Sequence, residues 1–250
     1  PMGVSYNSYV ILDEKIAVMD SVDARAAEEW LSNVAQVLEG RSPDYLVVTH
    51  MEPDHSGSLM RLAQKYPEMK IVGNAKTFTL IKQFFGTGAL SEDRMLEVGE
   101  RDTLSLGLHR LRFLLAPMVH WPEVMAAYEE EEKILFSADA FGRFGSLERT
   151  ARAPWAPQAR RYYYNIVGKY GAQGEALLEK ISALEIKTIC PLHGPMLTED
   201  LGEYLRLYDL WSQWKPEEPE GILIAHASIH GNTAYASEVL KGKLKGKGAQ

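Results

Sequence analysis

Short apolar runs alternate with longer amphipathic stretches along the chain, a pattern typical of an α/β protein. Residues 4–11 and 15–19 are predicted to form a β-hairpin that turns at residues 13–14. Residues 23–38 are predicted to form an amphipathic helix. Its apolar side chains recur at three- and four-residue steps, as the buried face of a helix requires: Ala27, Trp30, Leu31, Val34 and Leu38.

The same alternation continues along most of the chain. Strands are expected at residues 45–48, 71–73, 104–108, 111–116 and 188–190, and another just before Asp139. Helices are expected at residues 58–66 and 75–85, and as two segments divided near Gly171 between residues 157 and 183. Periodicity by itself predicts an α/β fold and does not choose among architectures.

The loop between the strand at 45–48 and the helix at 58–66 is crowded with potential metal ligands. Four of them lie within six residues: His50, Glu52, Asp54 and His55. Imidazoles and carboxylates at this density suit one or two transition-metal ions. The alternative is a polar loop that caps the next helix, for which Pro53, Asp54 and Ser56 are suitable. A cap needs one such side chain and not four, so we favour the metal loop.

Three further candidate ligands each follow a predicted strand: His120, Asp139 and His193. Two of them have a structural alternative: His120 could be a histidine satisfied by backbone groups at a turn, and Asp139 could cap a turn. Cys190 is a conceivable thiolate ligand, but a small buried cysteine is the favoured interpretation. His109 is expected to face solvent between two strands. The tyrosines at 162–164 are expected to pack in a core or a subunit interface, and lining a site is the alternative.

Composition and charge narrow the class of protein. The 250 residues are 46% hydrophobic and carry a formal net charge of −7, which suits one large domain, or a domain plus a fragment. The acidic balance argues against binding along a nucleic acid. A single cysteine excludes an intrachain disulfide and a four-cysteine rubredoxin or zinc-ribbon site. No apolar run approaches transmembrane length, so no membrane association and a cytoplasmic location are expected.

The composition changes near the C-terminus. Residues 214–220 are rich in proline and glutamate and are predicted to be a linker. A strand at 222–225, a turn at 226–233 and a helix at 234–245 are expected after it. Hydroxyls and backbone N–H groups at the start of a helix suit a phosphate dianion. The candidate residues for such a contact are Ser228, Ile229, His230, Gly231, Asn232 and Thr233.

The spacing His50-x-Glu52-x-Asp54-His55 resembles the metal loop of the metallo-β-lactamase superfamily, whose zinc hydrolases carry a histidine in place of Glu52. The exchange is similar to that in the flavodiiron proteins, whose lactamase-like domain holds two non-haem irons. A carboxylate is a harder ligand than imidazole and suits iron or manganese better than zinc. The Trp121-Pro122 pair after His120 and the run from Asp139 to Gly142 match the same family, and residues 228–233 resemble the FMN-phosphate loop of flavodoxins.

The resemblance implies a fold and a domain division. The fold is an α/β metallo-β-lactamase sandwich with αββα layers, followed by a truncated flavodoxin-like βα unit. The diiron domain spans residues 1–213, the linker 214–220, and the start of an FMN-binding domain 221–250. The flavin site is incomplete, because the loops that grip the ring are missing. The native protein is therefore expected to be longer. His230 stands where relatives usually have an aromatic residue or a threonine.

The resemblance also implies the ligands and the reaction. His50, Glu52 and His120 would hold one iron, Asp54, His55 and His193 the other, and Asp139 would bridge the two at a separation of about 3.5 Å. The implied activity is reduction of O2 to water, of NO to N2O, or both, with electrons from FMN. Rubredoxin or a related protein would be the electron donor, and a head-to-tail homodimer or a dimer of dimers would bring flavin and iron together.

Two other classes of function remain open at this stage. One is a dinuclear zinc hydrolase, in which a metal-bound hydroxide attacks a thioester or phosphodiester. Glu52 argues against it. The other is a metal-binding module without catalysis, since the flavin domain is truncated.

Replacing Glu52 with histidine is expected to restore the ligand pattern of the hydrolases. The Glu52→His protein should retain more zinc relative to iron and should reduce O2 or NO more slowly, because imidazole suits Zn²⁺ better than a hard carboxylate does. Elemental analysis and gas-consumption assays measure the two effects. Unchanged iron content and turnover would contradict this account of Glu52.

The 250-residue chain is expected to bind FMN weakly or not at all. A flavodoxin-like domain is of usual domain size, roughly 100–150 residues, and one strand with one helix bury too little apolar surface to fold alone. The phosphate loop supplies a few hydrogen bonds and no ring contacts. A fluorescence titration with FMN tests this. Tight, stoichiometric binding would mean that a second subunit or the lactamase-like domain holds the ring.

Overall fold

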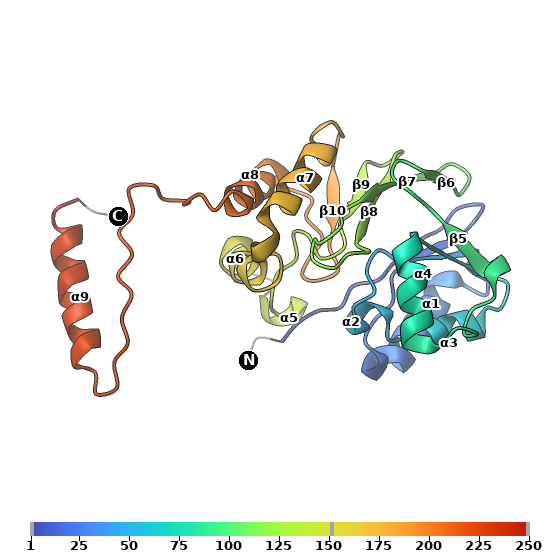
Figure 1. Cartoon of the computed structure of the whole chain (residues 1–250), viewed down its shortest axis with the longest axis horizontal. Coiled ribbons are helices and arrows are strands. Elements are labelled where there is room, and N and C mark those ends of the chain that lie inside the picture. Colours follow the sequence, from blue (N-terminus) through green and yellow to red (C-terminus); the bar gives the residue numbers. More distant parts are fainter. Residues whose placement is uncertain (1–2, 151–152, 249–250) are drawn as a thin grey trace. The chain divides into compact units, whose positions relative to one another are not determined.

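The computed structural model describes residues 3–150 and 153–248 (Figure 1). The chain divides into two compact units, Pro1–Gln213 and Trp214–Gln250. The first is called the larger unit below and the second the C-terminal unit. Each is described by itself.

Two five-stranded sheets form the centre of the larger unit. The strands of the first sheet, in spatial order, are β1 (Tyr9–Ile11), β2 (Ala17–Met19), β3 (Tyr45–Val47), β4 (Lys70–Gly73) and β5 (Met95–Glu97). Only the β1–β2 pair is antiparallel. The strands of the second sheet are β10 (Thr188–Cys190), β9 (Ile134–Phe136), β8 (Met125–Glu129), β7 (Arg110–Leu115) and β6 (Thr103–Ser105). Only the β9–β10 pair is parallel.

Helices cover the outer faces of both sheets (Figure 1). On the first sheet these are α1 (Ala27–Leu38), α3 (Leu59–Lys65) and α4 (Ala75–Phe85). On the second they are α6 (Trp155–Ile166), α7 (Gly171–Ser182) and α8 (Leu201–Ser212). The remaining helical segments of the larger unit are single turns: η1 (Ala24–Ala26), α2 (Pro53–Ser56), η2 (Glu92–Arg94), α5 (Leu147–Thr150) and η3 (Gly168–Tyr170).

The alternation of side chains along each strand explains the layers. On β3, Leu46 packs with the helices of the first sheet, whereas Val47 packs in the core between the sheets. On β7, Leu114 packs toward the helices of the second sheet, whereas Phe113 lies between the sheets. All four side chains are at most 4% exposed. This arrangement confirms the predicted αββα sandwich of the larger unit.

The structure adds elements that the pattern did not predict. Strand β8 gives only a weak strand signal, because it contains no β-branched residue and Tyr128 is its only residue typical of strands, although all five of its residues are buried. Helix α8 packs against α6 and α7 through Leu207, Tyr208 and Trp211. His109 lies between β6 and β7, as predicted, but its side chain is only 19% exposed because it contacts Asp13. Its ring Nδ1 and its backbone N lie 2.9 and 2.7 Å from one carboxylate oxygen of Asp13.

The C-terminal unit contains the predicted helix but not the predicted strand. Helix α9 spans Asn232–Lys245, whereas residues 222–225 form no strand. A strand needs a neighbour to accept its backbone hydrogen bonds, and the described residues of this unit supply none. No described residue of the unit is buried. Two of its apolar residues, Leu223 and Ile229, are more than 90% exposed.

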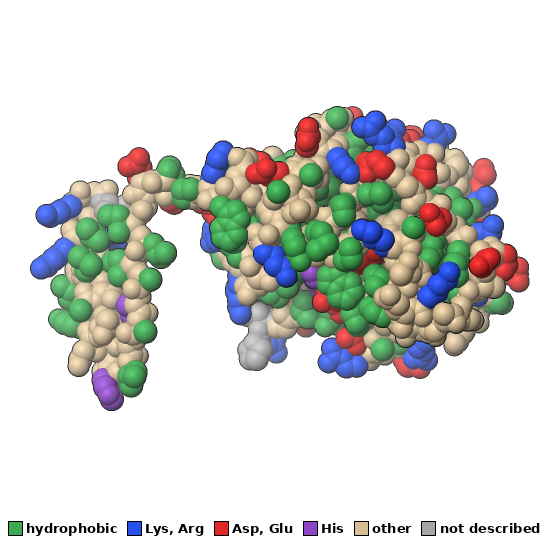
Figure 2. All heavy atoms as spheres, viewed as in Figure 1, with side chains coloured by type: hydrophobic (Ala, Val, Ile, Leu, Met, Phe, Trp, Pro, Cys, Tyr) green, Lys and Arg blue, Asp and Glu red, His purple; other side chains and the backbone are tan. Residues whose placement is uncertain are grey.

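Helix length and surface charge bear on whether a membrane or a polyanion is a partner. In the described part of the chain, every helix is too short or too polar to cross the apolar core of a bilayer. Acidic and basic side chains are interspersed on the face of the larger unit in Figure 2.

Truncating Phe113 is expected to destabilise the larger unit strongly. The side chain is fully buried between the two sheets, and replacing a buried phenylalanine with alanine costs about 3–5 kcal/mol. The matched control is Phe84→Ala, since Phe84 is 44% exposed. Urea denaturation of the wild type and both variants gives the free energies of unfolding. Equal losses in the two variants would contradict the placement of the inter-sheet core.

Candidate metal centre

The loop after β3 is held in shape by buried contacts. The carboxylate of Asp20 accepts hydrogen bonds from Thr49 N at 2.7 Å, Thr49 Oγ1 at 2.6 Å and His50 N at 3.2 Å. Burial raises the pKa of Asp20 to about 6. The loop ends in the single turn α2 and then at Gly57. A Cβ atom there would lie 2.6 Å from the carbonyl oxygen of Pro53 and 2.8 Å from Ala24 N, so only glycine fits.

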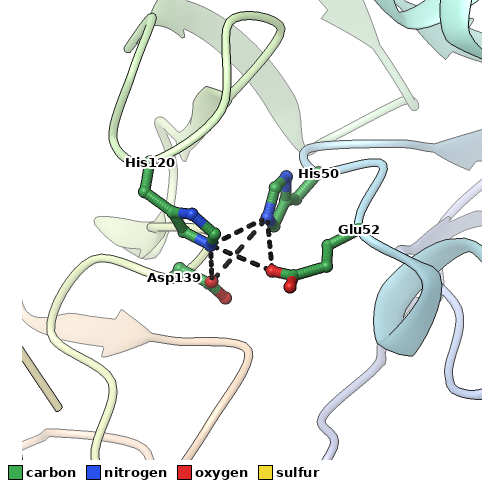
Figure 3. Close-up of side chains that lie close together, drawn as sticks. All are labelled: His50, Glu52, His120 and Asp139. Carbon is green, nitrogen blue, oxygen red and sulfur yellow. Dashed lines mark hydrogen bonds and ion pairs between the residues drawn. The ribbon is translucent and has the colours of Figure 1, made fainter. Parts of the chain in front are cut away.

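The first cluster of donors consists of four side chains that point toward one another (Figure 3). Its members are His50, Glu52, His120 and Asp139. The Nε2 atoms of His50 and His120 are 3.4 Å apart. Glu52 Oε2 lies 3.4 Å from His50 Nε2 and 2.9 Å from His120 Nε2.

The second cluster lies beside the first and contains Asp54, His55 and His193. The Nε2 atoms of His55 and His193 are 3.1 Å apart. Asp54 Oδ2 lies 3.5 Å from the first of these nitrogens and 3.4 Å from the second. His193 is followed by Gly194, whose φ of +89° gives the left-handed turn that glycine adopts without strain.

Asp139 faces both clusters with different oxygens. Its Oδ2 lies 3.0 Å from His120 Nε2 and 3.7 Å from His50 Nε2. Its Oδ1 lies 3.2 Å from His55 Nε2 and 3.6 Å from His193 Nε2. The residue lies three positions after the end of β9 and is 1% exposed. The structure therefore brings all seven residues predicted as metal ligands together.

The spacing and chemistry of these donors fit two metal ions. Donors about 2.1 Å from one ion, at angles of about 90–109°, stand about 3.0–3.4 Å from each other, and the distances above centre on this range. Two imidazole nitrogens at such a distance need a cation or a shared proton between them. Asp54 Oδ1 and Asp139 Oδ1 are buried and have no hydrogen-bond partner among the described residues, as expected of oxygens reserved for another ligand.

Two of the histidines are oriented through their other ring nitrogen. His50 Nδ1 donates to Glu123 Oε1 at 2.8 Å, and His193 Nδ1 donates to the backbone carbonyl of Ser5 at 2.7 Å. With the proton on Nδ1, the lone pair of Nε2 faces the cluster, as metal coordination requires. The sequence interpretation missed Glu123. The only feature of the sequence that could have indicated Glu123 is its position, three residues after the candidate ligand His120.

The electrostatic environment of the first cluster favours positive charge. Burial would lower the pKa of His50, but hydrogen bonds to Glu123 and Glu52 and the charge of Asp139 raise it to about 10. Hydrogen bonds from His120 and His50 lower the pKa of Glu52 to about 2. The ionised carboxylates therefore create a negative potential that protons or metal ions can neutralise.

Solvent reaches the double cluster mainly at three of its side chains. The side chains of Glu52, Asp54 and His120 are 36%, 24% and 12% exposed, whereas those of His50 and His55 are fully buried. Aromatic rings pack around the remainder: Trp121 at 5.4 Å from His50, and Tyr6 and Tyr162 at 5.8 and 5.5 Å from His193, measured between ring centroids.

The other candidates separate into core and C-terminal residues. Tyr163 packs in a core, as expected, whereas the buried Tyr162 borders the second cluster. Cys190 is buried between the sheets and belongs to neither cluster. Burial raises the pKa of its thiol to about 12.

The six residues predicted to contact the FMN phosphate lie in the C-terminal unit. All six are exposed, and they form a turn and the start of α9. Their role stays a prediction.

Comparison with known proteins identifies the family. A family model described as ODP family beta lactamase matches residues 4–194. The flavo-diiron protein FprA2 of Clostridium acetobutylicum is 31% identical over 250 residues, covering 96% of this chain and 62% of that protein. The anaerobic nitric oxide reductase flavorubredoxin of Vibrio vulnificus is 31% identical over 246 residues, covering 95% and 49%.

A solved structure agrees with these relatives. The rubredoxin oxygen:oxidoreductase of Desulfovibrio gigas has a TM-score of 0.84 at 29% identity, covering 100% of this chain and 63% of that one. The chain thus spans less than two thirds of the length of each of these proteins. Because the family model covers most of the chain and the fold agrees with it, the chain belongs to the ODP family of β-lactamases and comprises the metallo-β-lactamase-like domain of a flavodiiron protein.

Proposed function

We propose that the chain reduces O2 to water, NO to N2O, or both, at a non-haem diiron centre that receives electrons from FMN. The observation that carries the proposal is the pair of clusters that share Asp139, with Glu52 in the first cluster. His50, Glu52 and His120 would hold one iron, Asp54, His55 and His193 the other, and Asp139 would bridge them. The metals supply the redox chemistry: two ferrous ions provide two electrons, and reduced FMN the others.

The choice of iron rests on the donor set. Four imidazoles and three carboxylates give a ligand charge of about −3 against two divalent ions, and carboxylate oxygens suit iron better than zinc. Glu52 is the ligand that distinguishes this donor set from that of the zinc hydrolases, which carry a histidine in its place. The Glu52 side chain is 36% exposed, so a small substrate entering from solvent would meet it early.

Residues around the clusters would limit the access of water and donate a hydrogen bond near the metals. Trp121 and Phe84, whose ring centroids are 6.4 Å apart, form an apolar wall next to His50. Such a wall limits water at the site. On the other side, burial and the charge of Asp139 raise the pKa of Tyr162 well above its ordinary value, so its hydroxyl stays protonated. The raised pKa makes this hydroxyl a weak acid, so Tyr162 Oη would donate a hydrogen bond near the bridging carboxylate and would be a poor source of protons.

The source of electrons and the assembly are part of the proposal. Rubredoxin or a related protein would reduce FMN, and residues 228–233 would contact the FMN phosphate. A head-to-tail homodimer or a dimer of dimers would bring the flavin of one subunit to the metals of another. Because the described C-terminal unit supplies a turn and a helix only, the activity of the metals is tested first without flavin.

Single-turnover chemistry tests the proposal in the chain as it exists. The anaerobic chain loaded with Fe²⁺ should bind two ions and convert two NO to one N2O, since two ferrous ions supply the two electrons needed. Gas chromatography measures N2O, and an oxygen electrode measures O2 uptake by the same sample. The Asp139→Asn chain should hold fewer ions and react at least about tenfold more slowly. Loss of a residue that only supports a metal ligand already lowers affinity or activity by about tenfold or more, and Asp139 is proposed as a ligand itself.

The matched control is Asp93→Asn, because Asp93 is exposed on η2. It should behave as the wild type. A chain that prefers zinc to iron and hydrolyses a thioester or phosphodiester would overturn the proposal in favour of a dinuclear hydrolase. A chain that binds two irons but reacts with neither NO nor O2 would be a metal-binding module. That result would also overturn the proposed function.

A further inference from the structure

Glu123 is a fully buried carboxylate outside both metal clusters. Its Oε1 accepts two hydrogen bonds, from His50 Nδ1 and from Met51 N, both at 2.8 Å. Its other oxygen, Oε2, is buried and has no hydrogen-bond partner among the described residues. An ionised carboxylate with one oxygen unsatisfied is costly to bury. A contribution to stability alone therefore gives no account of this residue.

The backbone of Glu123 is fixed as firmly as its side chain. Asn74 Nδ2 donates to the carbonyl oxygen of Glu123 at 2.6 Å, and Asn74 Oδ1 caps α4 by accepting from Lys76 N and Thr77 N. The start of a helix on one sheet thus anchors the residue that orients His50. This anchoring allows Oε1 to hold the imidazole ring of His50 in a fixed orientation.

The two clusters differ in how their histidines are supported. In the first, a charged carboxylate accepts from His50 Nδ1. In the second, the neutral Ser5 carbonyl accepts from His193 Nδ1, and His55 Nδ1 is buried with no partner among the described residues. A charged acceptor makes the opposite ring nitrogen a stronger donor to a metal than a neutral acceptor does.

We infer that Glu123 is a positioning residue that sets the metal affinity of the first cluster and makes it the tighter of two unequal sites. The inference rests on the proposed dinuclear metal site. Glu123 acts through His50, by orienting the ring and by increasing the electron density at Nε2. The ion at His50, Glu52 and His120 is therefore the first to bind and the last to be removed by a chelator.

Competition between the chain and a chromophoric chelator for Co²⁺ measures the two affinities separately, and the visible Co²⁺ spectrum reports the ligand field of each ion. Glu123→Gln keeps an oxygen that accepts from His50 and Met51 but removes the charge. It should weaken the tighter Co²⁺ by about 10–100-fold, shift the spectrum of that ion and leave the weaker ion close to wild type. Glu123→Asp keeps the charge at a shorter reach and should show a smaller loss at the same ion.

The matched control is Glu129→Gln. Glu129 is also a buried glutamate, at the far end of β8, and its carboxylate accepts from Glu131 N and Glu132 N at 2.9 and 2.6 Å. This variant should leave both Co²⁺ affinities unchanged. Thermal unfolding of the metal-free proteins separates a loss of folding from a loss of affinity. Should Glu123→Gln fail to fold, Glu123→Asp carries the same test.

Wild-type affinities and spectrum in both Glu123 variants would overturn the inference and leave the proposed function standing. An equal loss at both ions in a folded variant would also overturn it, because it would indicate a general structural role. A wild-type chain that binds no Co²⁺ or Fe²⁺ would overturn the proposed function, and this inference with it.

Discussion

The arrangement of the larger unit depends on one carboxylate between two pairs of imidazoles. Asp139 lies within 3.7 Å of four histidine Nε2 atoms, two on each side. Its side chain is almost fully buried, so this contact requires compensating charge from protons or metal ions. Ligand-bearing loops follow β3, β7, β9 and β10, and the sandwich brings these ends to one edge. The fold therefore serves to place donors from distant parts of the chain around a single aspartate.

Supporting carboxylates behind the donors hold the loops in place. Asp20 accepts from the backbone of Thr49 and His50, and Glu123 accepts from the ring of His50 and the backbone of Met51. Each is buried, and each lowers the freedom of the segment that carries His50. Buried acids of this kind are weak evidence for stability. Their position beside a ligand indicates that the chain keeps them for the geometry of the site.

The sequence predicted the donors better than it predicted their supports. His50, Glu52, Asp54 and His55 are readable because residue type and spacing alone indicate a metal. Asp20 and Glu123 are not, because their contacts span 29 and 73 positions and only the tertiary fold creates them. The same holds for His109, whose partner Asp13 is 96 positions away. Alternating patterns predicted an α/β fold, whereas the sandwich was implied by the resemblance to the flavodiiron family. Strand β8 was hard to recognise because Tyr128 is its only residue typical of strands.

The exposed edge of the site bears on which substrates suit it. The two ligands most open to solvent are carboxylates, Glu52 and Asp54, and the chain as a whole carries a net charge of −7. A negative net charge slows the approach of an anionic substrate such as a phosphodiester and does not affect a small neutral molecule such as O2 or NO. Two divalent ions would offset the ligand charge of about −3, so this difference concerns the approach through solvent and not the metal site itself. The net charge of the chain and the donor set therefore both agree with the proposed small, neutral substrates.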